Sequence, residues 1–329
     1  MANTRSRIFK ELDDGQIASV VAHAVGEQAV IEEARLLGGG LFNTTYYLRT
    51  ARPEAKLVLR VAPIREELLF DFEKVMMGIE PLMYELMGNA GVPVPRVVLH
   101  DNSRAVIDRE YLLLDFVPDS MPFSDPSFPE EAKGRIQYEL GFYTRRIHGI
   151  RADQFGWPLP DGSVDGHLDW PDELARFCRE IARRCLEHQV AEEADLHAFE
   201  QFLRQNRPLF EITEPPCLVH NDLWAPNILV RPAAGGWEIA AIIDADRAMY
   251  ADREFEFALW GEEPRFMEGY GLPLDASEQG RKKRLYYQIV GALFGAYVYK
   301  AQYDNEAEYE NAKKWALDNL RELTAPQPG

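Results

Sequence analysis

The stretch LVHNDLWAPNILV, residues 218–230, places a histidine, two asparagines and an aspartate between two short apolar runs. The flanking runs are short, contain β-branched residues and are separated by a breaker, Pro226, which is typical of a turn between two buried strands. A turn explains the apolar flanks, but it does not explain why these polar side chains are present. Their identity therefore has to be explained by chemistry.

The chain continues as ILVRPAAGGWEIAAIIDAD, residues 228–246, which predicts a strand, a turn rich in Pro and Gly, and a second strand that ends at Asp244. A hairpin folds its second strand back along the first. We therefore expect Asp244 to lie near Asn227, although 17 residues separate them.

The spacing of Asp222 and Asn227 indicates phosphoryl-transfer chemistry. An asparagine five residues after an aspartate is the interval of the kinase catalytic loop, where the aspartate receives the substrate hydroxyl proton and the asparagine binds magnesium. Mg²⁺ prefers oxygen ligands and takes one or two protein carboxylates plus phosphate oxygens, so Asn227 and Asp244 are the predicted metal ligands. The alternatives are a tight polar turn at residues 220–227 and a capping role for Asp244.

A glycine-rich segment is the candidate phosphate cradle. LLGGGLFNTTYYL, residues 36–48, has three glycines between apolar strands, which lets backbone N–H groups approach phosphate oxygens. It is not a Walker loop, since no Gly-Lys-Ser/Thr follows, and an ordinary turn is the alternative. The residues of this segment that we expect to contact nucleotide are Gly39, Gly40, Asn43 and Thr44.

The next strand, KLVLRV, carries Lys56, Val58 and Arg60 on one face and core residues on the other. Val58 would lie against a nucleotide base, and Arg60 would reach the phosphates with its forked guanidinium. A solvated arginine at a strand end is the alternative. A buried cation needs an anion to orient it, and Glu80 is the candidate, with Glu73 and Glu85 as rivals.

The expected secondary structure changes along the chain, from mainly strands in the first part to mainly helices in the rest. Helices are expected over residues 13–26 and 65–90, the second interrupted by Pro81, and strands over 34–62 and 92–118. Beyond Pro118 the pattern is mostly helical, apart from the strand pair around residues 217–244. This predicts an α+β fold with a β-rich N-terminal nucleotide-binding lobe, residues 1–117, and a mainly helical catalytic and substrate-binding lobe, residues 118–329.

Composition narrows the class of protein. No run approaches the roughly 18 apolar residues that span a bilayer, and the N-terminus lacks an apolar signal core, so we expect a cytoplasmic protein without a membrane partner. The cysteines match no zinc pattern and are expected to be reduced. A formal charge of −18 argues against a nucleic-acid surface. Residues 119–329 contain 23 basic and 37 acidic side chains, −14 of this charge, which favours either a cationic small-molecule partner or ordinary solubility.

Eight segments, taken in order, resemble the aminoglycoside phosphotransferase and choline kinase-like superfamily. They are GGGLFNTTYYL (38–48), LVLRV (57–61), GVPVPRVV (91–98), YLLLDFVP (111–118), IHGI (147–150), HNDLWAPNILV (220–230), IIDAD (242–246) and DREFEFALW (252–260). The resemblance covers nearly the whole chain, and the joint order is more specific than any one motif. It implies a bilobal protein-kinase-like fold and a Mg²⁺-dependent kinase that uses ATP or GTP on a hydroxyl of a small molecule.

The resemblance also implies residue roles. Asp222 would be the catalytic aspartate, Asn227 and Asp244 the magnesium ligands, and Arg60 the phosphate contact with Glu80 behind it. The segment LDFVP, with Asp115 and Val117, would be the hinge whose backbone reads the base. The structural residues would be Asp252, Glu256, His148 and His220.

The acceptor stays open at this point. Aminoglycoside-like antibiotics and amino sugars are the first candidates, and Trp224 and DREFEFALW also resemble the fructosamine kinase branch. Acidic residues that would suit an amino-bearing acceptor, or form a solvated loop, are Glu262, Glu263 and Glu268. Asn221 stands where protein kinases carry arginine, which argues against control by a phosphorylated activation loop. A nucleotide-binding pseudokinase and a protein kinase are the rival functions.

Overall fold

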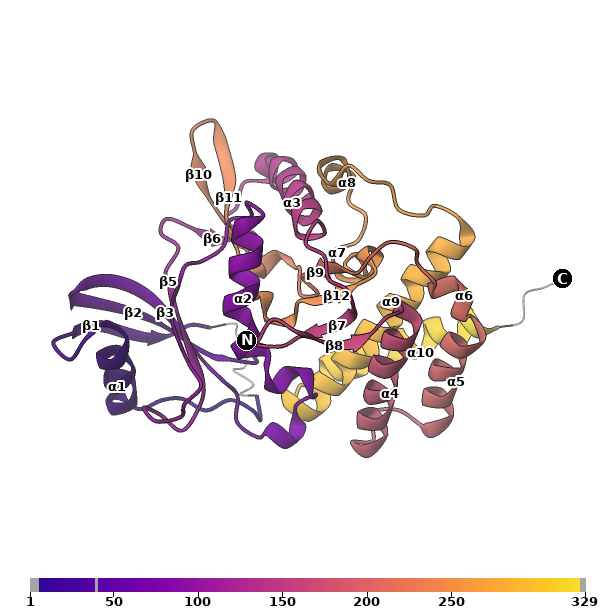
Figure 1. Cartoon of the computed structure of the whole chain (residues 1–329), viewed down its shortest axis with the longest axis horizontal. Coiled ribbons are helices and arrows are strands. Elements are labelled where there is room, and N and C mark those ends of the chain that lie inside the picture. The colour runs from indigo at the N-terminus through magenta and orange to yellow at the C-terminus, as the bar shows by residue number, and fades with distance from the viewer. Residues whose placement is uncertain (1–5, 39–40, 326–329) are drawn as a thin grey trace.

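The computed structural model describes residues 6–38 and 41–325. The first part of the chain forms a sheet with two helices at one end of the molecule, and the other end is mainly helical (Figure 1). The predicted α+β class, with a β-rich first lobe and a helical second lobe, is confirmed. The division at residues 117 and 118 stays a prediction.

The first lobe is built on an antiparallel five-stranded sheet in the order β1-β2-β3-β5-β4. Its strands are β1 (Val30–Leu36), β2 (Thr44–Arg52), β3 (Glu54–Val61), β4 (Val97–Asp101) and β5 (Tyr111–Asp115). Helix α1 (Asp14–Val25) packs on one face against Leu57, Leu59 and Val61, as the alternation of β3 predicts. Helix α2 (Met76–Asn89) packs with the opposite face, represented by Leu112 and Leu114.

The start of α1 shows why it begins where predicted. The Asp13 carboxylate accepts a hydrogen bond from Gln16 N–H at 2.8 Å, and the Gln16 side chain accepts one from Asp13 N–H at 3.0 Å. This reciprocal capping box satisfies two backbone donors that have no partner within the helix.

The helix expected over residues 65–90 is wrong in its first half. Two short 3₁₀ turns, Glu66–Leu68 and Phe72–Lys74, precede α2, which tolerates Pro81 within it. The apolar side chains of this segment, from Leu68 to Met76, are buried in the core of the second lobe and not on a helix face of the first. Tertiary burial therefore overrides the helical pattern and anchors the start of α2 on the other lobe.

The second lobe contains eight helices among the described residues. They are α3 (Lys133–Ile147), α4 (Trp170–Glu187), α5 (Glu193–Gln205), α6 (Arg207–Phe210), α7 (Phe257–Trp260), α8 (Pro264–Tyr270), α9 (Glu278–Tyr297) and α10 (Glu306–Thr324). A π-helical turn, Val298–Gln302, follows α9. Aromatic side chains from α4, α5 and α9, such as Trp170, Phe199 and Tyr287, form the centre of its core.

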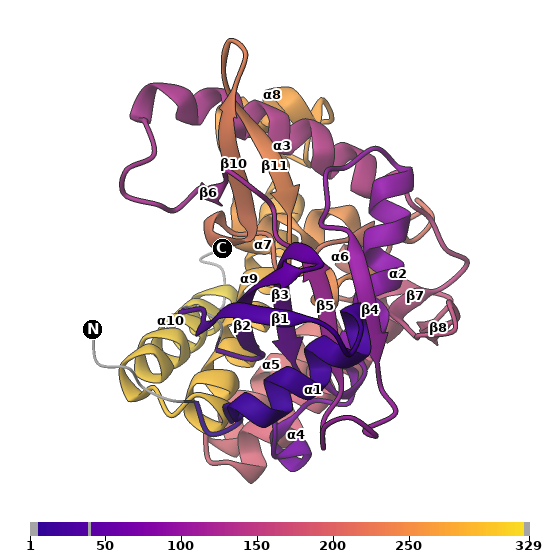
Figure 2. The ribbon, with the colours of Figure 1, turned by 90° about the vertical axis from the view of Figure 1, so that its left-hand side faces the viewer.

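Two small sheets carry the loops between these helices. One has the order β11-β10-β6 and the other β8-β7-β12-β9. Their strands are β6 (Met121–Pro122), β7 (Phe155–Pro158), β8 (Val164–His167), β9 (Cys217–Val219), β10 (Ile228–Ala233), β11 (Gly236–Ile242) and β12 (Met249–Ala251). The predicted hairpin is β10–β11, which projects beside α3 (Figure 2) and pairs Ile228 with Ile242 at its base.

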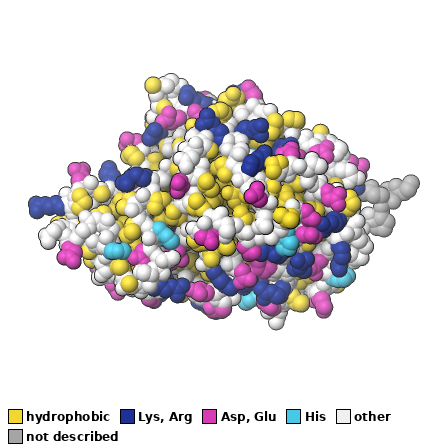
Figure 3. Space-filling model, viewed as in Figure 1, with side chains coloured by type: hydrophobic (Ala, Val, Ile, Leu, Met, Phe, Trp, Pro, Cys, Tyr) yellow, Lys and Arg dark blue, Asp and Glu magenta, His cyan; other side chains and the backbone are white. Residues whose placement is uncertain are grey.

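The surface mixes charges. On the face shown in Figure 3, acidic and basic side chains are interspersed. None of the described helices combines the length and the apolar character needed to cross a membrane. All three cysteines, Cys178, Cys185 and Cys217, are buried as free thiols, and burial raises their pKa to about 12.

Candidate active site

The loop between β9 and β10 is fixed by one buried carboxylate. Glu256 accepts hydrogen bonds from the backbone N–H groups of His220, at 2.6 Å, and Asn221, at 3.1 Å. Asn221 has the left-handed φ of 58°, and its side chain donates to Arg247 O at 3.2 Å. The rings of His148 and His220 are also engaged, with Tyr270 Oη and with Ile243 O. Glu256 and both histidines therefore act as the expected scaffold.

Asp222 projects from this loop and is partly buried. Asn227 Nδ2 donates to both Asp222 O and Asp222 Oδ2 at 2.9 Å. Burial raises the pKa of the Asp222 carboxyl to about 6; the Arg247 guanidinium opposes this rise, and the carboxylates of Asp244 and Asp246 add to it. A carboxylate with a pKa near neutrality can accept a proton from an alcohol more readily than an ordinary aspartate.

Asp244 lies beside Asn227, as the hairpin predicted. Ile243 N–H donates to Asn227 O at 2.9 Å, so the first residue after β11 is hydrogen-bonded to the residue just before β10. Asp244 itself has left-handed backbone angles, φ 58° and ψ 48°, and its carboxylate is 36% exposed. The Asp244 carboxylate is therefore accessible to a ligand.

The donor set around Asp244 suits magnesium. Within the described chain, nothing donates a hydrogen bond to Asn227 Oδ1 or Asp244 Oδ2, which leaves one amide oxygen and one carboxylate oxygen as ligands. No three His, Cys, Asp or Glu side chains of the described residues form a self-contained metal site. The pair would therefore hold Mg²⁺ only together with phosphate and water oxygens, which is the usual arrangement for this ion.

Arg60 is the centre of a buried ion cluster. Its Nη1 contacts Glu80 Oε1 and also lies 2.7 Å from Asp244 Oδ1, while Nη2 lies 2.8 Å from Asp246 Oδ2. Burial tends to lower the pKa of the Arg60 guanidinium, but the carboxylates of Asp244, Glu80 and Asp246 raise it well above its ordinary value. Arg60 therefore stays charged and uses both arms of its fork.

Of the three glutamates weighed from the sequence, Glu80 is the one that contacts Arg60. Glu85 is exposed, and Glu73 is buried elsewhere, where it accepts from Phe70 N–H and Gln302 Nε2. Burial raises the pKa of the Glu80 carboxyl, against the lowering effect of Arg60. One guanidinium here is shared by three carboxyl groups, those of Glu80, Asp244 and Asp246.

Sequence reasoning missed three residues of this site: Asp246, Tyr84 and Arg247. Asp246 follows Asp244 by two residues in IIDAD, and Tyr84 follows Glu80 by one helical turn, so both spacings were visible. Arg247 is partly buried near Asp222, with Nη2 at 3.5 Å from Glu73 Oε1 and its guanidinium over the rings of Phe294 and Phe42. No local pattern pointed to that role.

The predicted nucleotide-binding residues are only partly brought together. Gly39 and Gly40 lie outside the described residues. Asn43 is buried and donates to Asp246 Oδ2 at 3.3 Å, which joins the glycine-rich segment to the ion cluster. Thr44 is also buried, but its hydroxyl donates to Lys10 O at 3.1 Å and is therefore held by the N-terminal segment.

The predicted base-binding edge lies at the end of β5. Val58 is half-buried and packs with the apolar cluster that includes Leu114. The Asp115 carboxylate forms an ion pair with Arg96 at 2.6 Å, and Phe116 N–H donates to Lys56 O. Within the described chain, Val117 N–H has no hydrogen-bond partner, and its role in binding a base stays a prediction.

The acidic residues proposed for an amino-bearing acceptor already have structural partners. Glu262 lies 2.9 Å from Arg284 Nε, Glu263 caps α8 by accepting from Phe266 N–H at 2.7 Å, and Glu268 pairs with Arg265. These partners favour a structural role for the segment over a cation-binding site, and the expected loop is wrong in part, because Glu268 lies within α8.

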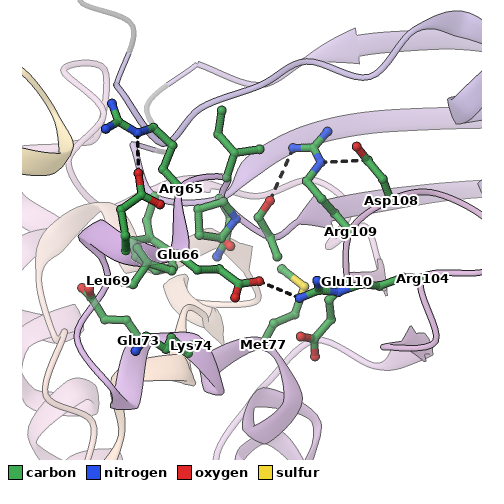
Figure 4. Close-up of a pocket in the computed structure, with 16 residues that line it drawn as sticks. Arg65, Glu66, Leu69, Glu73, Lys74, Met77, Arg104, Asp108, Arg109 and Glu110 are labelled. Carbon is green, nitrogen blue, oxygen red and sulfur yellow. Dashed lines mark hydrogen bonds and ion pairs between the residues drawn. The ribbon is translucent and has the colours of Figure 1, made fainter.

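A cavity of about 360 Å³ lies beside Asn43, next to the Arg60 ion cluster (Figure 4). It is bounded by Phe42 and Asn43, by the segment between β3 and α2, and by the β4–β5 loop. An ion pair of 2.7 Å joins Arg104 of that loop to Glu66 of the segment between β3 and α2. Asp222 and Asp244 are not among the residues that line it. The cavity adjoins the ion cluster through Asn43 without being part of the candidate catalytic centre.

Solved structures share this architecture. The complex of gentamicin with APH(2")-IIa has a TM-score of 0.65 at 17% identity and covers 96% of this chain and 99% of that chain. A candidate fructosamine-3-kinase from Thermobifida fusca has a TM-score of 0.64 at 20% identity, covering 93% and 100%. At such identities the likeness shows the fold, and the predicted kinase-like bilobal fold is confirmed.

Sequence comparison identifies the family. No curated protein sequence matches the chain. The profile of the phosphotransferase enzyme family, APH, matches residues 33–281, which is most of the chain and includes the ion cluster and the loop between β9 and β10. The suspected superfamily and the predicted phosphotransferase activity are confirmed, and the protein belongs to the phosphotransferase enzyme family.

Proposed function

We propose that the protein transfers the γ-phosphate of ATP or GTP to a hydroxyl group of a small molecule. The observation that carries this proposal is the meeting of Asp222, Asn227 and Asp244 at the base of one hairpin, next to the Arg60–Glu80 pair. Phosphoryl transfer needs mainly positioning and charge neutralisation, and these groups supply both.

Each residue has a distinct role in the proposed reaction. Asp222 orients the acceptor hydroxyl and takes its proton through the oxygen that Asn227 does not hold. Asn227 and Asp244 would hold Mg²⁺, which when bound neutralises charge on the phosphates. Arg60, fixed by Glu80 and Asp246, contacts the phosphates from the first lobe.

The acceptor is proposed to be an aminoglycoside-like antibiotic or an amino sugar. Trp224 supports a ring-shaped acceptor, because it lies two residues after Asp222 and is 50% exposed. An exposed indole offers a flat apolar face on which a sugar ring can stack. The engagement of Glu262, Glu263 and Glu268 in other contacts gives a polycationic acceptor no support from that loop.

A ketoamine acceptor is the second candidate, and Trp224 favours it equally. The structural neighbours include a complex with gentamicin and a candidate fructosamine-3-kinase, at similar TM-scores. The two acceptor classes share a hydroxylated ring and a nitrogen, so only turnover distinguishes them.

The cytoplasmic location stays a prediction.

The test is an ADP- and GDP-release screen of the purified protein with magnesium and either ATP or GTP. The acceptor panel contains aminoglycosides, macrolides, amino sugars, choline analogues and fructosyl-lysine, and Asp222→Asn protein serves as the matched control. We expect acceptor-dependent release with at least one class and its loss in the control, by at least roughly 10²-fold.

Two outcomes would contradict the proposal. Nucleotide binding without acceptor-dependent release across the panel would favour a pseudokinase that binds nucleotide only. Labelled phosphate on proteins and never on small acceptors would favour a protein kinase.

A further inference from the structure

Tyr84 joins the two sides of the candidate site. It lies on α2, one turn after Glu80, and its side chain is buried. Its hydroxyl donates to Glu80 Oε1 at 2.6 Å and accepts a hydrogen bond from Asp244 N–H at 3.1 Å. A single oxygen atom thus connects the acid behind Arg60 with the backbone of the metal-binding turn.

The direction of these two bonds is fixed by the atoms involved. A phenol has one proton to donate, and a backbone N–H can only donate. The phenol proton therefore goes to Glu80, and the Asp244 N–H fills a lone pair of the same oxygen. Burial, together with the charge of Glu80, raises the pKa of Tyr84 well above its ordinary value, so the proton stays on the phenol.

The bond to Asp244 supports an unusual backbone conformation. Left-handed angles are uncommon for a residue other than glycine and need support from their surroundings. Two consecutive N–H groups are held here: Ile243 N–H by Asn227 O, and Asp244 N–H by Tyr84 Oη. The first comes from the second lobe and the other from α2, so the turn is held from both lobes.

The same turn directs the Asp244 carboxylate. With the backbone held in this conformation, Asp244 Oδ1 lies 2.7 Å from Arg60 Nη1, and the other carboxylate oxygen is left for a ligand. A turn that relaxed to ordinary right-handed angles would point this side chain in another direction. The orientation of the proposed magnesium ligand therefore depends on the bond to Tyr84.

We propose that Tyr84 is a positioning residue that couples α2 to the magnesium-binding turn and thereby sets the metal-dependent part of nucleotide affinity. This inference rests on the proposed function. Tyr84 touches neither nucleotide nor acceptor in it; the residue acts through Glu80 and Asp244. A merely structural role would weaken the fold and change nucleotide binding equally with and without metal.

The experiment compares wild type with Tyr84→Phe, which keeps the ring and removes only the hydroxyl. The matched control is Tyr286→Phe, because Tyr286 is also buried and donates one hydrogen bond, to Phe199 O at 2.9 Å, in the core of the second lobe. Dissociation constants for ADP and for a non-hydrolysable ATP analogue are measured calorimetrically with magnesium and with EDTA, and thermal unfolding is recorded for all three proteins.

We expect Tyr84→Phe to lose roughly 3- to 10-fold of the affinity gained from magnesium, the loss typical of one hydrogen bond, with metal-free affinity within about twofold of wild type. Tyr286→Phe should keep the whole gain while its unfolding temperature falls. The inference is overturned if Tyr84→Phe keeps the gain, or if Tyr286→Phe loses as much.

The same measurement separates this inference from the proposed function. Wild-type protein that binds no nucleotide would refute both. If wild type and Tyr84→Phe gain the same nucleotide affinity from magnesium, only the role of Tyr84 is refuted, and the proposed function stands.

Discussion

Asn227 donates its side-chain amide to Asp222 Oδ2 at 2.9 Å, across a turn of five residues. The bond holds one carboxylate oxygen and leaves the other directed away from the amide. Asn227 O accepts a hydrogen bond from Ile243 N–H, so Asp244 follows directly after the residue that is bound to Asn227. A single hydrogen bond thus orders both the proposed proton acceptor and one proposed metal ligand.

Asp222→Asn should make the protein more stable while it lowers turnover by at least roughly 10²-fold. The folded-state pKa of about 6 lies above the ordinary value of 3.8, so the charged form is disfavoured by folding. This penalty is fully present above pH 6, shrinks as the pH falls and is gone below about pH 4. The neutral amide removes it, and because Asp222 is only partly buried we expect a gain of about 1–3 kcal/mol at pH 8.

The measurement is urea unfolding of wild type and Asp222→Asn, in EDTA, at pH 8 and at pH 4.5. The difference in free energy of unfolding should be largest at pH 8. A difference from wild type that is the same at both pH values would contradict the unfavourable environment assigned to the Asp222 carboxylate. A variant less stable than wild type at pH 8 would contradict it too.

Arg60→Lys should weaken both nucleotide binding and the fold. A lysine ammonium has no fork, so it cannot contact Glu80 and Asp244 with one arm and Asp246 with the other. One buried carboxylate then loses its partner, which costs about 1–3 kcal/mol of stability, and the KM for nucleotide should rise roughly tenfold. The control is Arg35→Lys, since Arg35 is 53% exposed and forms an ion pair with Glu33 away from the candidate site.

Steady-state kinetics and chemical denaturation together check this expectation. Improved nucleotide affinity in Arg60→Lys, with unchanged stability, would mean that the cluster around Arg60 does not need a guanidinium.

The parts of the site that the sequence predicted are those set by local geometry. Strand pairing in β10–β11 obliges Asp244 to return beside Asn227, and the alternation of β3 sends Arg60 away from the core face that contains Leu57 and Leu59. The two-residue period of a strand and the register of the hairpin are enough to predict these positions.

The parts that were missed depend on contacts between distant segments. Asp246 contacts Arg60 because the chain turns with left-handed backbone angles at Asp244, and no sequence pattern predicts that turn. Thr44 is predicted to contact nucleotide, but its hydroxyl donates to Lys10 O in the N-terminal segment. Residues 66–75 fit a helical period, yet their apolar side chains are buried in the other lobe.

Arg247→Gln should shift the acid limb of the pH profile upward. Arg247 is the main group that opposes the rise in the pKa of Asp222, so its removal lets that pKa rise further. The carboxylate then protonates at higher pH, and kcat/KM for the acceptor should fall off about one unit higher than in wild type. Arg321→Gln is the control, because the Arg321 side chain is 64% exposed on α10. An acid limb at the same pH as in wild type, with normal turnover, would show that Arg247 does not affect Asp222 in the reaction.

Trp224→Ala should raise the KM for the acceptor with little change in kcat. The indole is 50% exposed beside the catalytic loop and makes no hydrogen bond that the fold needs, since no described residue accepts from its N–H. A stacking surface binds the ground state and the transition state alike, so its loss appears in KM, by roughly tenfold. Trp315→Ala is the matched control, because Trp315 is 41% exposed on α10. Equal effects of the two substitutions, or a loss in kcat alone for Trp224→Ala, would show that Trp224 does not carry the acceptor ring.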